Sequence, residues 1–173
     1  CPYHRSHGWY IAKGGDLKAM MAELFGREAG CCKGWGGSMH LVDVGRGVMG
    51  SSSILGGTIP HAVGCALAFQ IQEVENVAIA PCGDAAIEEG VFHESMNWAS
   101  LKKLPVVFVC ENNLYSTSSP LGVRQPPVEI YKRTVSYGIP GVRVDGNDVL
   151  KVYEAALEAV SLARAGDGPT LIE

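Results

Sequence analysis

The sequence predicts an α/β protein, a three-layer arrangement in which helices cover both faces of a parallel sheet. Short apolar runs rich in β-branched residues alternate with longer segments of helical periodicity. The runs carry almost no polar residues, which is typical of strands that are buried on both faces. Apolar residues make up 47% of the 173 residues and charged residues 18%, as expected for a globular domain with a real core.

The strands are predicted from four apolar segments that follow residue 76. The clearest is PVVFVCE, and the others are VAIAPC, GVRVD and PTLIE, so the predicted strands span 77–82, 105–111, 141–145 and 169–173. Pro81 is expected at the end of its strand, because proline cannot donate a hydrogen bond to a ladder.

Helices are predicted between and before these strands, over 17–25, 61–73, 88–102, 129–137 and 147–166. Asp16 is a candidate N-cap for the first of them. The segment 61–73 is apolar nearly all round and should be buried under a sheet or against another subunit, with Pro60 at its first position.

The segment 147–166 is strongly amphipathic. Asn147 or Asp148 should cap its beginning, and Gly166 should end it. Its predicted apolar stripe is formed by Val149, Tyr153, Ala156, Val160 and Ala163.

Composition disfavours several kinds of partner. The formal net charge is −4 and no cluster of Lys or Arg appears, so we expect neither nucleic acid nor an anionic membrane as a partner. No run approaches the roughly 18 apolar residues of a membrane span, and no signal peptide is visible. A generic dinucleotide binder is disfavoured because no G-x-G-x-x-G follows a strand.

Six cysteines are scattered along the chain, and Cys31 and Cys32 are neighbours. No C-x-x-C pair occurs, so neither a zinc site nor a redox motif is indicated. Cys65, Cys82 and Cys110 lie inside apolar runs. We therefore expect a reduced cytoplasmic protein with buried thiols.

Polar residues follow two of the predicted strands, where parallel sheets bind ligands. Asp84 follows the first, and Asn112 and Asn113 follow the second, 29 positions after Asp84. If these strands are neighbours, a carboxylate and an amide oxygen meet at one edge and form the oxygen-ligand set that Mg²⁺ prefers. The N–H groups of residues 85–86 would open a helix and favour a phosphate. Taken separately, each motif is also typical of a simple turn or helix cap.

A family resemblance rests on these residues. The stretch GDAAIEEGVFHESMNWASLKKLPVVFVCENN resembles the thiamine-diphosphate signature, Gly-Asp-Gly followed by Asn-Asn. The chain is also similar to alpha subunits of 2-oxoacid dehydrogenases, of the pyruvate and acetoin type. It shares with them, in the same order along the sequence, the segments HRSHGWYIAKGGD, CKGWGGSMH, GSSSILGGTIP and ENNLYS. Ala85 stands where the signature has glycine, and a positive φ there would cost an alanine about 1 kcal/mol or more.

The resemblance implies a site for thiamine diphosphate and Mg²⁺. Asp84, Asn113 and the backbone carbonyl of Tyr115 would hold the metal, and Gly83, Ala85 and Ala86 would line the diphosphate loop. His4 and Arg5 would reach the diphosphate, Ser53 and Leu55 would hold the aminopyrimidine through their backbone, and His7 would lie near the reacting centre.

The resemblance also implies partners and a reaction. A single thiamine-diphosphate-binding domain, spanning residues 1–173 and lacking the family's N-terminal arm and C-terminal loop, would work with a beta subunit. It would decarboxylate a 2-oxoacid and pass the acyl group to a lipoyl-bearing acyltransferase. The alternative is a non-catalytic remnant of the fold that self-associates and binds cofactor poorly. We expect an oligomer in either case.

Overall fold

The computed structural model describes residues 2–127 and 129–173 and divides the chain into two compact units, Cys1–Thr58 and Ile59–Glu173. Among the described residues, no helix is long and apolar enough to cross a membrane.

The first unit consists of short helices and glycine-rich loops. It contains α1 (His7–Ala12), α2 (Leu17–Leu24) and the 3₁₀ turn η1 (Val44–Arg46). Asp16 caps α2 as predicted, because its carboxylate accepts the backbone N–H of Lys18 at 2.7 Å. A small apolar core holds the unit together, formed by Tyr10, Met20, Leu41 and Val48.

The second unit is built on a four-stranded sheet. Its strands are β1 (Ala78–Gly83), β2 (Val106–Glu111), β6 (Thr170–Ile172) and β5 (Gly141–Val142), hydrogen-bonded in that order. Every pairing in this sheet is parallel, as the sequence predicts. A separate antiparallel hairpin, β3 (Tyr115–Ser116) and β4 (Ser119–Pro120), follows β2.

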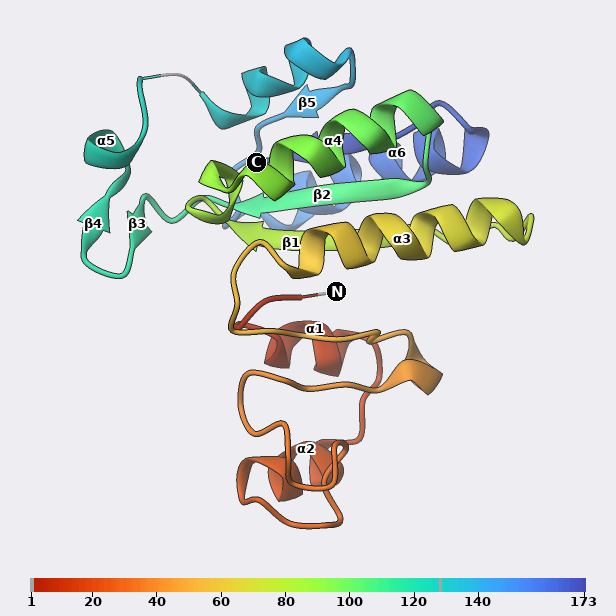
Figure 1. Ribbon diagram of the computed structural model, residues 1–173, viewed down its shortest axis with the longest axis vertical. Coiled ribbons are helices and arrows are strands. Elements are labelled where there is room, and N and C mark those ends of the chain that lie inside the picture. Colours follow the sequence, from red (N-terminus) through yellow and green to blue (C-terminus); the bar gives the residue numbers. More distant parts are fainter. Residues whose placement is uncertain (1, 128) are drawn as a thin grey trace. The chain divides into compact units, whose positions relative to one another are not determined.

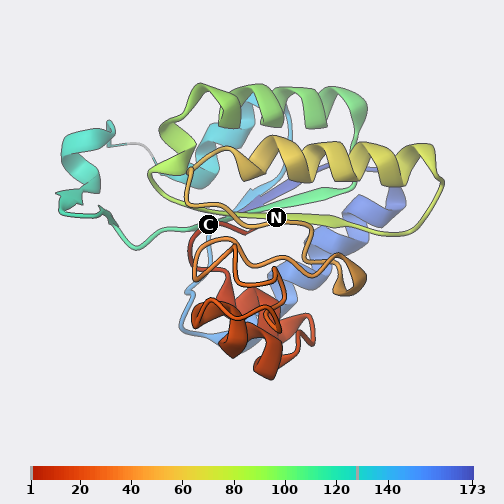
Figure 2. The same cartoon turned by 60° about the horizontal axis from the view of Figure 1, so that its bottom comes forward.

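Helices cover both faces of the sheet (Figures 1 and 2). The helices α3 (Thr58–Ile71) and α4 (Gly90–Lys102) lie side by side on one face, and α6 (Val149–Ala165) lies on the other. The short elements η2 (Ala86–Glu88), α5 (Leu121–Arg124) and η3 (Ile130–Tyr137) connect these parts. The predicted three-layer α/β architecture is confirmed.

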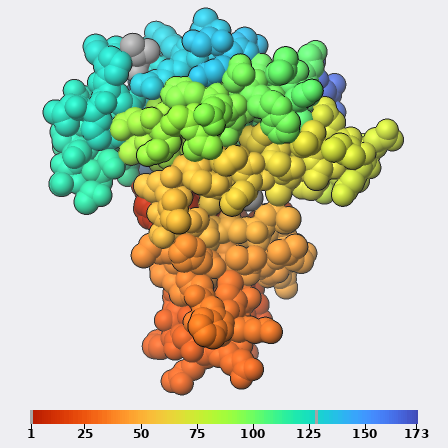
Figure 3. All heavy atoms as spheres, viewed as in Figure 1, coloured from red at the N-terminus to blue at the C-terminus, as the bar shows by residue number. Residues whose placement is uncertain are grey.

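The core between α4 and the sheet is formed by large aromatic and aliphatic side chains. Phe92 of α4 and Phe108 of β2 are both fully buried and meet edge to face, with ring centroids 6.3 Å apart. Met96, one turn further along α4, is fully buried as well. The space-filling view shows α3 and α4 packed together into one continuous layer (Figure 3).

Pro81 lies inside β1 and not at its end, where the sequence analysis placed it. The N–H of Ala78 donates toward β2, to the carbonyl of Pro105 at 2.9 Å. Because N–H groups alternate in direction along a strand, the nitrogen of Pro81 points away from β2. Among the described strands, β1 is the outermost at this side of the sheet, so Pro81 breaks no hydrogen bond of the ladder.

The helix α6 begins after Asp148, whose carboxylate accepts the N–H of Leu150 at 3.1 Å, and it ends at Gly166 with φ of 82°. Both caps were predicted, but the apolar stripe was partly wrong. Val149 and Tyr153 are 77% and 64% exposed. The helix packs on the sheet through a set of small residues and one valine: Ala155, Ala156, Ala159 and Val160.

Candidate functional site

The ends of β1 and β2 lie beside each other at the carboxyl edge of the sheet. Gly83 pairs with Glu111 at the last position of the ladder. Asp84 therefore leaves β1 at the same level at which Asn112 leaves β2. This confirms that the two strands are neighbours, on which the predicted meeting of the acidic and amide motifs depends.

Asp84 is buried, with 1% of its surface exposed, and it has a cationic partner. The guanidinium of Arg124, at the end of α5, donates through Nη2 to Asp84 Oδ2. Gln125 adds a second contact, because its Nε2 donates to the backbone carbonyl of Asp84 at 2.8 Å. A buried carboxylate is stable as an ion only when it is paired and hydrogen-bonded, and both conditions are met here.

Arg124 and Gln125 extend this contact into a network. Arg124 Nη1 donates to Glu88 Oε1, which also accepts Gln125 Nε2 at 2.7 Å. Arg133 of η3 in turn donates to Gln125 Oε1 at 2.7 Å. Sequence reasoning missed these residues, because they lie about 40 or more positions from Asp84 in a segment without regular periodicity. The only hint in the sequence near this position is Arg124, a single arginine between two proline-containing turns.

Residues 85–86 do not open a regular α-helix, contrary to the sequence-based expectation. Ala85 caps the three-residue 3₁₀ turn η2, and α4 begins only at Gly90. Ala85 has φ of −79°, an ordinary value for an L-residue, so its Cβ causes no strain in place of the family's glycine. Gly83 has open space where a Cβ would point.

Asn112 and Asn113 shape the loop that follows β2. Asn113 Oδ1 accepts the N–H of Tyr115 at 3.0 Å, and Asn112 Oδ1 accepts the N–H of Leu114 at 3.1 Å. Each is a side-chain turn of the kind that asparagine favours. The Asn112 amide also donates to Glu173 Oε1 at 2.8 Å, which ties the loop to the end of the chain. Asn113 and Tyr115 are exposed.

In the first unit, an isolated parallel bridge between Tyr3 and Ser52 joins the N-terminal segment to the loop around residue 53. This bridge brings the predicted His4 and Arg5 to the same part of the unit as Ser53. All three side chains are exposed, and Leu55 is 37% exposed.

His7 and His40 form hydrogen bonds within the first unit. His7, the first residue of α1, lies with Nε2 3.2 Å from Ser38 Oγ. His40 Nε2 lies 3.3 Å from Ser53 Oγ, and His40 Nδ1 lies 3.2 Å from the carbonyl of Ser51. The Ser53 side chain is therefore held by His40, which was not among the predicted site residues.

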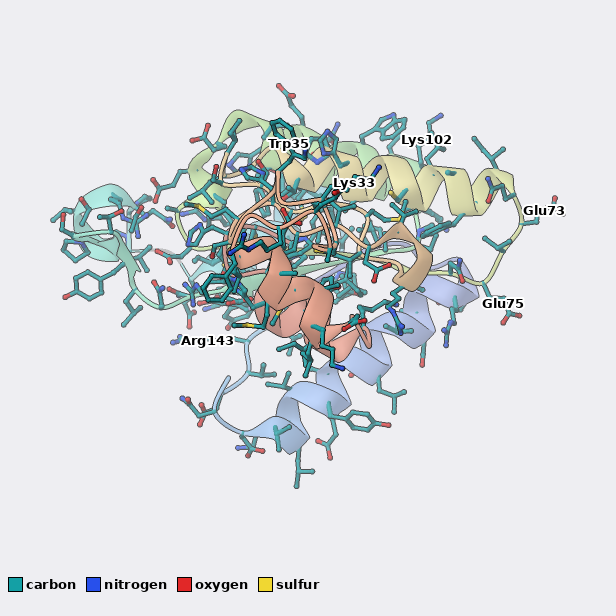
Figure 4. All side chains as sticks on the ribbon, turned by 90° about the horizontal axis from the view of Figure 1, so that it is seen from below. Lys33, Trp35, Glu73, Glu75, Lys102 and Arg143 are labelled. Carbon is teal, nitrogen blue, oxygen red and sulfur yellow. The ribbon has the colours of Figure 1, made fainter. Side chains whose placement is uncertain are left out.

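Glu23 organises the glycine-rich loop of the first unit, which we call the Glu23 loop and define as residues 30–40. Its carboxylate is fully buried and accepts four backbone N–H groups at 2.6–3.1 Å, those of Cys32, Gly34, Gly36 and Gly37. Burial by itself would raise the pKa of Glu23, but these four donors outweigh it and lower the pKa below its usual value. Lys33 and Trp35 project from this loop (Figure 4), and Trp35 is 91% exposed.

Comparisons with known proteins place this fold in a class. Transketolase from Pichia stipitis matches 70% of this chain and 19% of its own, with 25% identity and a TM-score of 0.60. An enzyme from Mycobacterium smegmatis assigned as thiamin diphosphate-dependent matches 73% of this chain and 24% of its own, with 24% identity and a TM-score of 0.55. The fold is that of the thiamine-diphosphate-dependent enzymes.

The chain belongs to the family of dehydrogenase E1 components, whose model matches residues 1–173. It is 48% identical over 170 residues to the alpha subunit of acetoin:2,6-dichlorophenolindophenol oxidoreductase from Bacillus subtilis, covering 98% of this chain and 51% of the relative. It is 44% identical to pyruvate dehydrogenase E1 component subunit alpha-3 from Arabidopsis thaliana, covering 98% and 41%. The chain thus spans about half the length of these relatives.

Proposed function

We propose that this chain forms the cofactor-binding part of the alpha subunit of a thiamine-diphosphate- and Mg²⁺-dependent dehydrogenase that acts on a 2-oxoacid or on acetoin. The observation that carries this proposal is the position of Asp84, a buried carboxylate at the carboxyl end of β1 beside the end of β2. Family membership supports it, because both relatives named above are alpha subunits of acetoin- or pyruvate-oxidising enzymes.

The donor set at this edge fits the metal. Asp84 offers a carboxylate, Asn113 an amide oxygen and Tyr115 a backbone carbonyl, and oxygen ligands of these kinds suit Mg²⁺. Gly83 has open space where a Cβ would point, and Ala85 adopts an ordinary φ of −79°.

Roles follow for the residues of the first unit. Arg5 offers a planar cation suited to phosphate, and His4 lies next to it. Ser53 and Leu55 would hold the aminopyrimidine through their backbone, and His7 would orient or protonate the substrate. Thiamine diphosphate, when bound, supplies the nucleophile and electron sink, while the protein binds and orients it. The acyl group would then pass to a lipoyl-bearing acyltransferase.

The ion pair between Arg124 and Asp84 limits how a metal ion could reach the Asp84 carboxylate. Asp84 has almost no exposed surface, and Arg124 contacts its carboxylate directly. A metal ion that binds Asp84 must therefore displace Arg124 or share the carboxylate with it. Arg124 is the last residue of α5, the short helix that follows the hairpin β3–β4, and its guanidinium also contacts Glu88, so its release would break both ion pairs.

A second candidate function is a non-catalytic remnant of the fold, favoured by one observation. Arg124 pairs with Asp84 and also with Glu88, so the Asp84 carboxylate already has a cationic partner without a metal. In this case the protein would keep the fold, associate with itself and bind the cofactor weakly or not at all.

A partner subunit is supported by the exposed apolar face of α6. Val149, Leu150, Tyr153 and Leu157 are all more than half exposed, at 77%, 70%, 64% and 54%. Contiguous apolar surface of this kind usually marks an interface. We propose that it is covered by a beta subunit or a second alpha chain, and sedimentation with and without the beta subunit separates these from a monomer.

Calorimetric titration tests the proposal directly. Thiamine diphosphate is titrated into the protein in the presence and absence of Mg²⁺, and saturable binding that requires Mg²⁺ is expected. The variant Asp84→Ala should abolish it, whereas the matched control Asp167→Ala, which removes an exposed carboxylate, should leave it unchanged. If millimolar cofactor gives no heat of binding even with the beta subunit present, the protein is the non-catalytic remnant of the fold.

A further inference from the structure

The two neighbouring cysteines of the Glu23 loop form a pair of facing thiols. Cys31 and Cys32 are both free and half-buried, and their sulfur atoms lie 3.9 Å apart. The Glu23 carboxylate lies beside them, with the ligand atoms of all three side chains within 4.8 Å of one another. The family comparison assigns no role to this cluster.

The distance between the sulfur atoms is the one that a shared metal ion requires. Two thiolates bound about 2.3 Å from a tetrahedral zinc ion lie about 3.8 Å apart, whereas two sulfur atoms in a disulfide lie about 2.05 Å apart. The observed 3.9 Å separation is that of two thiols in hydrogen-bonding contact, and it is also close to the spacing of two metal-bound thiolates. Adjacent residues also hold both ligands on one short stretch of backbone, which reduces the conformational entropy that binding must remove.

Glu23 supplies a fixed negative charge and not a direct ligand. Its two oxygens each accept two backbone N–H groups, so the roughly four lone-pair positions of a carboxylate are filled. The same bonds fix the backbone of Cys32 through its N–H, at 2.8 Å. The carboxylate thus orients the thiol pair and places a buried anion close to any bound cation.

Further oxygen atoms lie next to the thiols. The backbone carbonyl of His40 is 3.3 Å from Cys32 Sγ, and that of Val42 is 3.9 Å from it. The half-buried position of both cysteines leaves access for an ion and for water ligands. The cluster therefore offers two soft ligands from the protein, with two backbone carbonyls beside one of them.

We propose that Cys31 and Cys32 bind one thiophilic divalent cation of the zinc or cadmium class, with Glu23 as the buried counter-charge. Binding replaces two S–H bonds by two sulfur–metal bonds and releases two protons to the buffer, with no change of oxidation state. The absence of a C-x-x-C spacing hid this site in the sequence, because its two ligands are adjacent residues.

A bound ion would stabilise the conformation of the Glu23 loop. The loop has no regular secondary structure between α2 and η1, and it is held mainly by the bonds to Glu23. A metal that links both thiols fixes the start of this loop in addition. Mg²⁺ should not compete, because it prefers oxygen ligands, so the cluster is chemically separate from the predicted magnesium site.

Titration of the reduced protein with cadmium chloride is the sharpest test. One equivalent should produce the ultraviolet charge-transfer band of two cadmium–thiolate bonds, and Zn²⁺ should suppress it by competition. Calorimetry with Zn²⁺ in buffers of different ionisation enthalpy should report two protons released per ion. The unfolding temperature should rise with Zn²⁺ concentration, because the ion binds the folded state.

Variants locate the site. Cys31→Ser and Cys32→Ser should each weaken cadmium binding about 100-fold or more, since loss of groups that merely orient ligands already costs about 10- to 100-fold. Cys65→Ser, which removes another half-buried thiol, should leave the band unchanged, and so should Asp84→Asn. Circular dichroism of each variant verifies that it is folded.

Two results would overturn the proposal. One is the absence of a charge-transfer band in the reduced wild-type protein at micromolar cadmium. The other is a band of equal intensity in folded Cys31→Ser and Cys32→Ser variants, which would assign the binding to other thiols. Neither result bears on the thiamine-diphosphate proposal, which Asp84→Ala tests separately.

Discussion

Arg124 forms an ion pair with Asp84 across 40 positions of sequence, and the two side chains are 12% and 2% exposed. The carboxylate that the sequence predicts as a magnesium ligand is thus bound to a cation supplied by the chain itself. Pairs of this kind depend on each other, because removing one member leaves a buried charge without a partner.

Replacing Arg124 by Gln should increase the affinity for Mg²⁺ in the presence of thiamine diphosphate. The arginine and the metal compete for one carboxylate, and a hydrogen bond to a charged group contributes about 1.5–3 kcal/mol, or roughly 10- to 100-fold in affinity. Calorimetric Mg²⁺ titration measures the change. The control is Arg143→Gln, which removes the exposed arginine that directly follows β5. Weaker Mg²⁺ binding in Arg124→Gln would mean that Arg124 helps to bind the cofactor.

Replacing Asp84 by Asn should destabilise the protein without metal or cofactor. The change removes one of the two carboxylates that pair with the largely buried Arg124 and leaves it only the more exposed Glu88, so the cost should lie at the lower end of the about 3–5 kcal/mol of a broken buried pair. Urea unfolding of Asp84→Asn, Arg124→Gln and the double variant measures this. The double variant should lose less stability than the sum of the single variants, because neither charge is then left unpaired. Strictly additive losses would show that the pair contributes nothing.

Replacing Glu23 by Gln should loosen the Glu23 loop. The amide group cannot accept hydrogen bonds on its nitrogen, so two of the four backbone donors lose their acceptor, at about 1–3 kcal/mol for each buried group. Hydrogen exchange at Gly34 and Gly36 should become faster, and urea unfolding should shift to lower denaturant. Glu28→Gln changes an exposed glutamate near the same loop and should have no effect. Unchanged exchange at both glycines would contradict the assigned role.

Two glycines of the second unit should respond to alanine in opposite ways. A Cβ at Gly141 would overlap the carbonyl of Tyr131, so Gly141→Ala should lose about 1–3 kcal/mol of stability through overpacking. Gly64 lies inside α3 with open space around the Cβ position, so Gly64→Ala should gain roughly 0.5–1 kcal/mol. Thermal unfolding of both variants checks the prediction. A gain in Gly141→Ala would mean that β5 can shift away from η3.

The sequence predicted the elements of the fold closely, because the signals that define them are local. Asp16 and Asp148 were identified as helix caps, since a cap bonds N–H groups two or three residues away. The helix 17–25 is observed as Leu17–Leu24, and the strand 105–111 as Val106–Glu111. The boundaries of buried strands follow from short apolar runs in the same way.

Predictions that depend on where segments distant in sequence lie in the fold were wrong in part. The Pro81 prediction failed because sequence does not reveal that β1 is the outer strand, with the nitrogen of Pro81 turned away from β2. The α6 stripe was wrong for Val149 and Tyr153, because the helix packs against the sheet through residues from Ala155 onward.

The sequence by itself determined the family, the alternation of strands and helices, and the position of Asp84 at the end of a strand. Only the tertiary structure decided what Asp84 and Glu23 contact, and how far apart the thiols of Cys31 and Cys32 lie. The physical reason is that capping and periodicity act within one turn or strand, whereas ion pairs, buried acceptors and ligand spacings depend on where the folded backbone brings remote groups.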